Sequence, residues 1–336
     1  LKDNPPLQAD MVVLAIGVTP DTVLAKEAGL ELGIKESIVV NDRMETSVPD
    51  IYAAGDAVQV KHYVTGNDAL ISLAGPANKQ GRIIADNICG GDSRYLGSQG
   101  SSVIKVFDMT AATTGINETN AKKSGLEVDT VILSPMSHAG YYPGGKVMTM
   151  KVVFEKESYR LLGAQIIGYE GVDKRIDVLA TAIHAGLKAT QLKDLDLAYA
   201  PPYSSAKDPV NMAGFMIDNI AKGILKQWHL EDMDKISKDK DVVLLDVRTV
   251  GEFSRGHIDG FKNIPVDELR ERISEIEKGK PVYLICQSGL RSYIASRILE
   301  GNGYETYNFS GGFRFYDAVV NDRVLIERAY ACGMDY

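Results

Sequence analysis

Apolar runs separated by glycine and proline outline the first part of the chain. Residues 11–16 form a continuous apolar run, which is typical of a strand buried on both faces of a parallel sheet. Residues 17–20 contain glycine and proline and break this run, and residues 21–30 have a helical pattern. A short strand is expected at 38–40. The order strand, turn, helix, strand indicates an α/β unit.

The middle of the chain has a different pattern. Residues 103–107, 147–154 and 161–168 are expected to be strands of one sheet. Apolar residues spaced by three and four predict amphipathic helices over 176–187 and 210–224. Strands followed by long helices indicate an α+β domain.

Alternation of strands and helices returns in the last third. Strands are predicted at 242–247 and 282–286, a helix at 291–300 and a further strand at 304–309. The mostly polar stretch 227–240 is interpreted as a linker with a short helix. About 100 residues suffice for one doubly wound α/β domain here.

Composition and charge exclude several classes of function. The chain has 336 residues and a net charge of −8, which argues against a general nucleic-acid-binding surface. No apolar run approaches the roughly 20 residues that a membrane-spanning helix needs, so no membrane association is predicted. Cys89, Cys286 and Cys332 lack the spacing of disulfide frameworks and metal sites. Reduced thiols, a cytoplasmic location and the absence of a metal centre are therefore expected.

The most reactive candidate is Cys286, which ends a predicted strand just before a helix. Ligands of open α/β sheets bind at the carboxyl ends of strands, near the N-termini of helices. The unpaired N–H groups there favour thiolate over thiol. Gly289 allows the loop to curl so that successive amides point inward, and Arg291 adds a fixed positive charge. Such a loop suits a nucleophile that accepts a sulfur atom and holds it as a persulfide.

Motifs around this loop resemble a rhodanese domain. The matching segments are 245–248, 252–253, 256–258, 263–265, 286–292 and 311–313. The resemblance implies that Cys286 is the sulfur acceptor and that Gln287, Ser288, Gly289, Leu290 and Arg291 cradle the persulfide. Asp246 and Arg248 resemble scaffold residues of the family. Two alternatives stay open: a buried core cysteine, and the related phosphatase-like loop, which has one residue more than the four between Cys286 and Arg291.

The segment 46–56 has the character of the rim of a dinucleotide site. A strand predicted at 51–54 ends at Gly55, where the missing Cβ allows another backbone or a ligand to approach. Asp56 then presents a carboxylate to a sugar hydroxyl. The alternative is that Asp56 is a turn former or a helix N-cap.

Together with residues 15–20, this segment resembles the flavin disulfide reductase family. The resemblance implies that one set of residues binds the ribityl and pyrophosphate groups of FAD: Thr46, Pro49, Ile51, Gly55 and Asp56. Residues 73–82 resemble the family's helix that points its N-terminus at the flavin ring, which adds Ala74, Gly75 and Pro76 to the cofactor residues. Pro76 suits the first turn of this helix, predicted over 75–88.

The middle domain narrows the resemblance to coenzyme A-disulfide reductases, on the segments 138–144, 171–175 and 198–208. It implies a homodimer formed through 100–225, in which Tyr141 and Tyr199 reach the partner's redox centre. It also implies that Asn78 and Lys207 lie at the coenzyme A site. The alternatives are packing tyrosines, a surface lysine and an asparagine that is simply a polar residue in the first turn of a helix. Lys174 and Arg175 are interpreted as a structural ion pair or surface feature.

One departure from the family is large, because the sequence has neither of its two Gly-x-Gly-x-x-Gly fingerprints nor the redox cysteine that follows the first. The chain therefore resembles the C-terminal part of a longer reductase. On this interpretation residues 1–40 end an NAD(P)-binding domain and residues 41–95 belong to the FAD-binding domain. Residues 100–225 form the dimerisation domain and residues 230–336 the rhodanese domain.

The expected function is reduction of coenzyme A disulfide, coenzyme A persulfide or polysulfide with NAD(P)H, FAD and coenzyme A as cofactors. Cys286 would take sulfur from a sulfane-sulfur donor. One alternative is a flavin NADH oxidase or peroxidase with an appended sulfur carrier. The other is a non-enzymatic dimerising module that binds sulfur.

Overall fold

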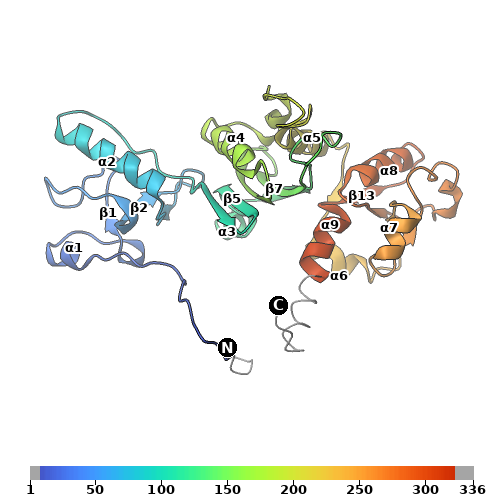
Figure 1. Ribbon diagram of the computed structural model, residues 1–336, viewed down its shortest axis with the longest axis horizontal. Coiled ribbons are helices and arrows are strands. Elements are labelled where there is room, and N and C mark those ends of the chain that lie inside the picture. The colour runs from blue at the N-terminus through green and yellow to red at the C-terminus, as the bar shows by residue number, and fades with distance from the viewer. Residues whose placement is uncertain (1–7, 322–336) are drawn as a thin grey trace. The chain divides into compact units, whose positions relative to one another are not determined.

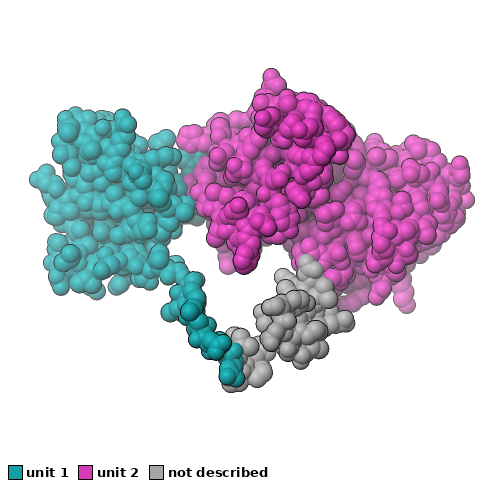
Figure 2. Space-filling model, viewed as in Figure 1, with its two compact units in different colours: residues 1–98 teal, residues 99–336 magenta. Residues whose placement is uncertain are grey.

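A computed structural model describes residues 8–321 of the chain. It divides into two compact units, one up to residue 98 and one from residue 99 onward (Figure 2). The first unit contains one sheet and the second contains two (Figure 1). Among the described residues, no helix combines the length and the apolar character needed to cross a bilayer.

The first unit is built on a small mixed sheet. Its strands are β1 (Ile38–Val39), β2 (Val58–Lys61) and β3 (Asp68–Ala69), with β1–β2 parallel and β2–β3 antiparallel. The buried side chains of Met44, Val58 and Val60 form its core. The helices are α1 (Val23–Glu27), the 3-10 turns η1 (Ile34–Glu36) and η2 (Gly55–Ala57), and the long α2 (Ala74–Ile88).

Two strand predictions in this unit are wrong. Residues 11–16 are not a strand, and Met11 and Ile16 are 81% and 86% exposed. Residues 51–54 make only an isolated bridge through Tyr52 to Glu45. A strand buried on both faces needs neighbouring strands and covering helices. Among residues 8–98 the only sheet is β1–β2–β3, which offers 11–16 no pairing partner.

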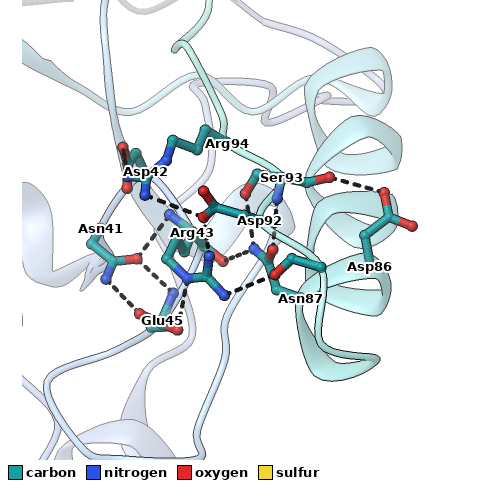
Figure 3. Close-up of polar contacts among 10 residues, drawn as sticks. Asn41, Asp42, Arg43, Glu45, Asp86, Asn87, Asp92, Ser93 and Arg94 are labelled. Atoms are coloured by element: carbon teal, nitrogen blue, oxygen red, sulfur yellow. Dashed lines mark hydrogen bonds and ion pairs between the residues drawn. The ribbon is translucent and has the colours of Figure 1, made fainter.

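The end of α2 is fixed by a polar network (Figure 3). The Asn87 amide is 5% exposed; it donates to the carbonyl oxygens of Arg43 (3.1 Å) and Ser93 (2.9 Å) and accepts from the Ser93 N–H (2.8 Å). The Arg43 guanidinium adds ion pairs to Glu45 and Asp92. Because every hydrogen-bonding atom of Asn87 is used, the network is a structural clamp that joins α2 to the segment after β1.

The second unit begins with an antiparallel sheet in the order β4-β5-β8-β7-β6. Its strands are β4 (Ser102–Val106), β5 (Met109–Gly115), β6 (Val128–Leu133), β7 (Met148–Glu155) and β8 (Leu161–Gly168). The three strands predicted here and both helices, α4 (Val172–His184) and α5 (Pro209–Ala221), are confirmed. Helix α4 packs on β5 and β8, and α5 packs on β6 and the 3-10 segment η3 (Ala189–Asp194). Strands β5 and β6 and the short α3 (Glu118–Lys123) are not predicted from the sequence.

The last part of the unit is a five-stranded parallel sheet, ordered β11-β10-β12-β13-β9. Its strands are β9 (Gln227–Trp228), β10 (Val243–Asp246), β11 (Lys262–Asn263), β12 (Val282–Ile285) and β13 (Thr306–Phe309). The helices around it are α6 (Met233–Ile236), α7 (Val250–Arg255), α8 (Leu290–Glu300) and α9 (Gly312–Tyr316), with the 3-10 turns η4 (Leu230–Asp232) and η5 (Ile273–Glu275) and the π-helical segment η6 (Asp317–Asn321). Apolar clusters cover both faces of the sheet, as the doubly wound prediction requires.

The prediction of a linker over 227–240 is wrong at its start. Strand β9 pairs with β13 as an edge strand, and Trp228 is 2% exposed. The indole lies 4.5 Å from the ring of Phe309 and 5.6 Å from that of Tyr283, measured between ring centroids. The strand is only two residues long, so its sequence has no alternation to detect, and its burial comes from tertiary packing.

Candidate active site

The predicted nucleophile lies where β12 ends and α8 begins. Gly289, the N-cap of α8, has φ of +100°, which turns its N–H back toward Cys286. That N–H donates to Cys286 Sγ at 3.1 Å, and the Ser292 hydroxyl lies 3.2 Å from the same sulfur. Cys286 is 1% exposed and belongs to the apolar cluster on the α8 side of the sheet. The sulfur is therefore buried, and it has two polar donors in place of a purely hydrocarbon environment.

The Gly311-Gly312 pair packs against the back of this loop. A Cβ at Gly312 would lie 2.7 Å from the Ser288 nitrogen and 2.8 Å from the Cys286 carbonyl oxygen, and the φ of Gly312 is +67°. Only glycine fits both this close approach and this backbone conformation. The Phe313 N–H then donates to the Cys286 carbonyl at 2.8 Å. The start of α9 thus fixes the backbone of the nucleophile.

Arg291 makes an ion pair that the sequence does not predict. Its guanidinium donates to both carboxylate oxygens of Glu252, at 2.7 and 2.6 Å. The Arg291 hydrogen bonds are the main reason that the pKa of Glu252 is lowered to about 2, and the pKa of Arg291 is raised for the same reason. The electrostatic interaction with Cys286 also raises the pKa of Arg291. The role of Arg291 as a charge beside the persulfide stays a prediction, and Glu252 partly neutralises that charge.

A second ion pair, Asp246–Arg248, lies beneath the site. The two side chains are 1% and 2% exposed and approach to 2.7 Å. Arg248 also donates to the Gly256 carbonyl at 2.8 Å and stacks over the Phe313 ring at 3.8 Å. Buried charges persist only when they are paired and hydrogen-bonded. This arrangement supports the interpretation of Asp246 and Arg248 as scaffold residues.

The hydroxyls of the two predicted catalytic tyrosines meet in the second unit. The hydroxyls of Tyr141 and Tyr199 are 2.7 Å apart, although 58 positions separate them in the sequence. This hydrogen bond is the main cause of a raised pKa at Tyr199. Tyr199 also lines a cavity of about 510 Å³ that includes His138 and Lys174. The side chains of Tyr141 and Tyr199 are 76% and 45% exposed, which leaves both hydroxyls accessible.

A buried ion pair holds the loop that carries Tyr199 and Lys207. Arg175 and Asp208 are 1% and 3% exposed and lie 2.9 Å apart. Arg175 also donates to the carbonyl of Ser137 at 3.0 Å, and the Asp208 carboxylate accepts from the N–H of Val210 at the start of α5. Arg175 is therefore a structural ion-pair residue, and Lys174 only contacts the Ala198 carbonyl at 3.3 Å.

Lys207 borders the same pocket as the loop 286–291 that follows β12, here called the sulfur loop. The pocket has a volume of about 520 Å³, and Lys207, Ser288, Gly289 and Leu290 lie in its wall. The antiparallel sheet and the parallel-sheet part of the second unit also contact each other directly. Asp129 of β6 accepts from Gln227 at 3.1 Å and lies 3.0 Å from His229 Nε2, and the Ser310 hydroxyl accepts from the Ile132 N–H at 3.0 Å.

In the first unit, the predicted flavin residues gather at the N-terminus of α2. Gly55 has φ of +86°, and its N–H donates to Gln80 of α2 at 2.7 Å. Asp56, Ala74 and Gly75 are exposed, whereas Pro76 is half-buried. No side chain among the described residues caps the N-terminus of α2. An open helix N-terminus beside an exposed carboxylate fits one rim of an FAD site, with the helix favouring negative charge on the reduced ring.

The remaining predicted residues of this unit make local contacts. The Thr46 hydroxyl is bonded to the backbone of Val48 at 3.2 Å, and Pro49 and Ile51 are exposed. The Asn78 amide donates to the Ala74 carbonyl at 2.9 Å, one turn earlier in α2. Asn78 therefore contacts its own helix, as a polar residue near the start of a helix can, and its coenzyme A role stays a prediction. No cluster of three potential metal ligands occurs in the portion of the chain described by the structure.

Comparison with known families accounts for all these parts. Residues 1–81 match the model described as pyridine nucleotide-disulphide oxidoreductase, and residues 101–209 match the dimerisation domain of that family. Residues 229–318 match the rhodanese-like domain. The chain carries domains of the pyridine nucleotide-disulphide oxidoreductase family followed by a rhodanese-like domain. The boundaries predicted at 40, 95, 100, 225 and 230 stay predictions.

Two solved structures resemble this chain over most of its length. The crystal structure of reduced Bacillus anthracis CoADR-RHD has a TM-score of 0.91 and 48% identity, and the match covers 94% of this chain and 57% of that one. An NAD-dependent persulfide reductase from A. fulgidus has a TM-score of 0.84 and 42% identity, covering 92% of this chain and 56% of that one.

A curated relative is the NAD(P)H sulfur oxidoreductase (CoA-dependent) of Pyrococcus furiosus. It is 38% identical over 210 residues, which cover 62% of this chain and 47% of the relative. The chain therefore spans about half the length of the curated relatives that it matches.

Proposed function

We propose that this oxidoreductase chain serves in the reduction of coenzyme A disulfide, coenzyme A persulfide or polysulfide, with Cys286 as its carrier of sulfane sulfur. The observation that carries the proposal is the placement of Cys286 Sγ against the Gly289 N–H and the Ser292 hydroxyl at the start of α8. Two donors on a buried sulfur stabilise a thiolate, and a thiolate is the form that attacks sulfur.

The sulfur-transfer step balances without an added oxidant. The Cys286 thiolate attacks the outer sulfur of a sulfane donor such as thiosulfate, a new S–S bond forms, and sulfite leaves with the electron pair of the broken bond. An acceptor thiolate then attacks the outer sulfur of the protonated persulfide. The Cys286–sulfur bond breaks, its electron pair returns to Cys286 Sγ, and the acceptor leaves as a persulfide.

The reductase part of the proposal rests on the predicted FAD residues of the first unit and on the tyrosine pair Tyr141 and Tyr199. Gly55, Asp56 and the first turn of α2 would hold FAD, which supplies electrons from NAD(P)H when bound. Tyr141 and Tyr199 are proposed to act on a thiolate at the redox centre of a second subunit, because the hydroxyl that accepts in their mutual hydrogen bond keeps its own hydrogen to donate. A homodimer formed through residues 100–225 is part of the same proposal, supported by the match to a dimerisation domain.

A cytoplasmic location fits this chemistry. Cys89 and Cys286 are free thiols in the described residues, and the sequence has no disulfide-type spacing. A persulfide carrier needs a reducing environment that keeps its thiol available.

The NADH oxidase or peroxidase alternative is less favoured. Two solved structures that match more than nine-tenths of this chain are the Bacillus anthracis CoADR-RHD and the A. fulgidus persulfide reductase. An oxidase has no use for a loop that stabilises a carrier thiolate. Consumption of NAD(P)H with coenzyme A disulfide, polysulfide, oxygen and peroxide as separate substrates discriminates the two. Turnover with oxygen or peroxide alone would contradict the proposal.

The sulfur-carrier role has its own test in the complete chain. Transfer of sulfur from thiosulfate to cyanide is expected for the native sequence and is expected to disappear in Cys286→Ser. A Cys89→Ser variant is the matched control, because Cys89 is an exposed cysteine in the other unit. Equal transfer by Cys286→Ser and the native chain would remove the catalytic role and leave the non-enzymatic alternative.

A further inference from the structure

The ion pair between Glu252 and Arg291 lies beside the nucleophile and joins the starts of two helices, α7 and α8. The Arg291 guanidinium donates to both carboxylate oxygens of Glu252, at 2.7 and 2.6 Å, and among residues 8–321 all its hydrogen bonds go to this carboxylate. The neighbouring Ser292 hydroxyl lies 3.2 Å from Cys286 Sγ. An electrostatic interaction with Cys286 contributes to the raised pKa of Arg291, so the guanidinium charge acts at the sulfur.

Glu252 is itself fixed by the first turn of α7. The Thr249 N–H and hydroxyl donate to Glu252 Oε2 at 3.0 and 2.9 Å, and the Glu252 N–H donates to Thr249 Oγ1 at 3.2 Å. These contacts form a capping box. The side chains of Arg291 and Glu252 are 30% and 22% exposed. A carboxylate held by its own helix therefore holds the guanidinium of the next helix in one place.

The pair cancels a positive charge at a site where charge affects the choice of donor. A lone guanidinium beside a thiolate would attract anionic donors. A carboxylate in direct contact with it removes most of this attraction, because opposite charges at such a short distance act on a third group as a dipole. The other ion pair at the site, between Asp246 and Arg248, is also neutral as a whole. The Cys286 thiolate is therefore not compensated by a net positive charge from these two pairs.

We propose that Glu252 sets the charge selectivity of the sulfur loop: by pairing with Arg291, it disfavours doubly negative sulfur donors such as thiosulfate relative to persulfides, which carry at most one negative charge. The inference rests on the proposed sulfur-carrier function and adds the class of donor. Glu252 is a positioning and specificity residue that acts through Arg291. Thiosulfate remains a donor, at a lower rate than an uncancelled guanidinium would give.

The favoured step balances without an added oxidant. The Cys286 thiolate attacks the outer sulfur of a persulfide R–S–SH, and a new S–S bond forms. The S–S bond of the donor breaks, RS⁻ leaves with its electron pair, and the proton stays on the transferred sulfur. This step brings no second negative charge to the thiolate, whereas attack on thiosulfate brings two charges toward it.

Alkylation of Cys286 in the complete chain tests the charge at the sulfur without any sulfur transfer. Iodoacetate and iodoacetamide differ by one negative charge, so the ratio of their rates, read from the mass of the Cys286 peptide, does not depend on the thiolate fraction. Glu252→Gln keeps the capping box, because glutamine also serves at this position. It is expected to raise the iodoacetate-to-iodoacetamide ratio about fivefold, the effect of one unit charge a few ångströms away in a medium close to water.

Two further variants complete a double-mutant cycle. Arg291→Gln should lower the ratio below the native value, because it leaves the Glu252 charge uncancelled. The double variant, with glutamine at both positions, should return the ratio to within about twofold of the native value. A purely structural pair would give no such pattern, because loss of packing slows both reagents alike.

Glu275→Gln is the matched control. Glu275 makes a similar two-bonded pair with Arg272, at 2.6 and 3.1 Å, in the segment η5, which contributes no residue to the sulfur loop. This variant removes one carboxylate charge from the same domain and should leave the Cys286 ratio at the native value. Cys89, an exposed cysteine of the first unit, is the internal standard, and its ratio should be the same in every variant.

Loading of Cys286 with sulfur then tests the choice of donor, with thiosulfate and the persulfide of 2-mercaptoethanol as separate donors. Glu252→Gln is expected to raise the ratio of thiosulfate to persulfide loading about fivefold. Unchanged ratios in both assays, or an equal change in Glu275→Gln, would overturn the selectivity while leaving the carrier function intact. Absence of loading from both donors in the native chain is a different result: it refutes the sulfur-carrier function, and the donor selectivity with it.

Discussion

Replacing Ser292 by alanine tests the electrostatics of the sulfur directly. The Ser292 hydroxyl lies 3.2 Å from Cys286 Sγ and 3.1 Å from the Gly289 carbonyl oxygen. A hydroxyl has a single hydrogen, so it can donate to only one of them at a time. When Cys286 is a thiolate, the hydrogen is expected to turn to the sulfur. The Gly289 carbonyl keeps the hydrogen bond from Asn308 at 3.1 Å.

The size of the effect follows from these contacts. A hydrogen bond to a charged group contributes about 1.5–3 kcal/mol, and we take the lower end because a sulfur acceptor is large and diffuse. Removing about 1.5 kcal/mol of thiolate stabilisation lowers the rate of sulfur transfer about tenfold. The fold should lose less than about 1 kcal/mol, since the Gly289 carbonyl stays paired.

The assay is the rate of Cys286 alkylation and of sulfur transfer to cyanide in the complete chain. Ser296→Ala is the matched control, because Ser296 lies one turn later in α8, is 1% exposed and donates to the Tyr293 carbonyl at 2.7 Å. The control should react at the native rate. A native rate in Ser292→Ala, or an equal loss in both variants, would refute the reasoning.

Three further predictions concern the surrounding structure. Asn87→Ala removes three hydrogen bonds and should weaken the local stability of α2 by about 2–3 kcal/mol, measured by hydrogen exchange of its amides. In Glu252→Gln the ion pair with Arg291 is lost, which should cost about 1 kcal/mol at neutral pH after solvent screening. Because the pKa of Glu252 is lowered from 4.5 to about 2, this deficit should be full above pH 4.5 and vanish as the pH falls toward 2, as followed by urea unfolding. Tyr141→Phe should return the raised pKa of Tyr199 toward its ordinary value, as seen in an ultraviolet titration against a Tyr199→Phe reference.

The sulfur loop is the part of the molecule that the sequence predicts best. An apolar strand, a glycine loop and a helix follow one another within 282–300, and each has a local signal. The two glycines at 311 and 312 also belong to the predicted motif, and the close approach of Gly312 to the loop supplies its physical reason.

Contacts between distant residues are the part that the sequence does not predict. Glu252 and Arg291 are 39 positions apart, and only the fold places their side chains together. The same holds for the hydroxyls of Tyr141 and Tyr199, which are 58 positions apart in the sequence.

The wrong strand predictions have a related cause. An apolar run such as 11–16 indicates a buried strand only when neighbouring strands exist to pair with it, and none among residues 8–98 does so. Conversely, β9 has almost no local signal and is a strand because Trp228 packs against the aromatic residues of the parallel sheet.

The most direct measurement is the mass of the Cys286 peptide before and after the complete chain is treated with thiosulfate. If peptide donors keep this sulfur ready for transfer, the peptide gains one sulfur atom, which cyanide then removes, while the Cys89 peptide keeps its mass. A Cys286 peptide of unaltered mass, or a gain at Cys89 alone, would contradict the account.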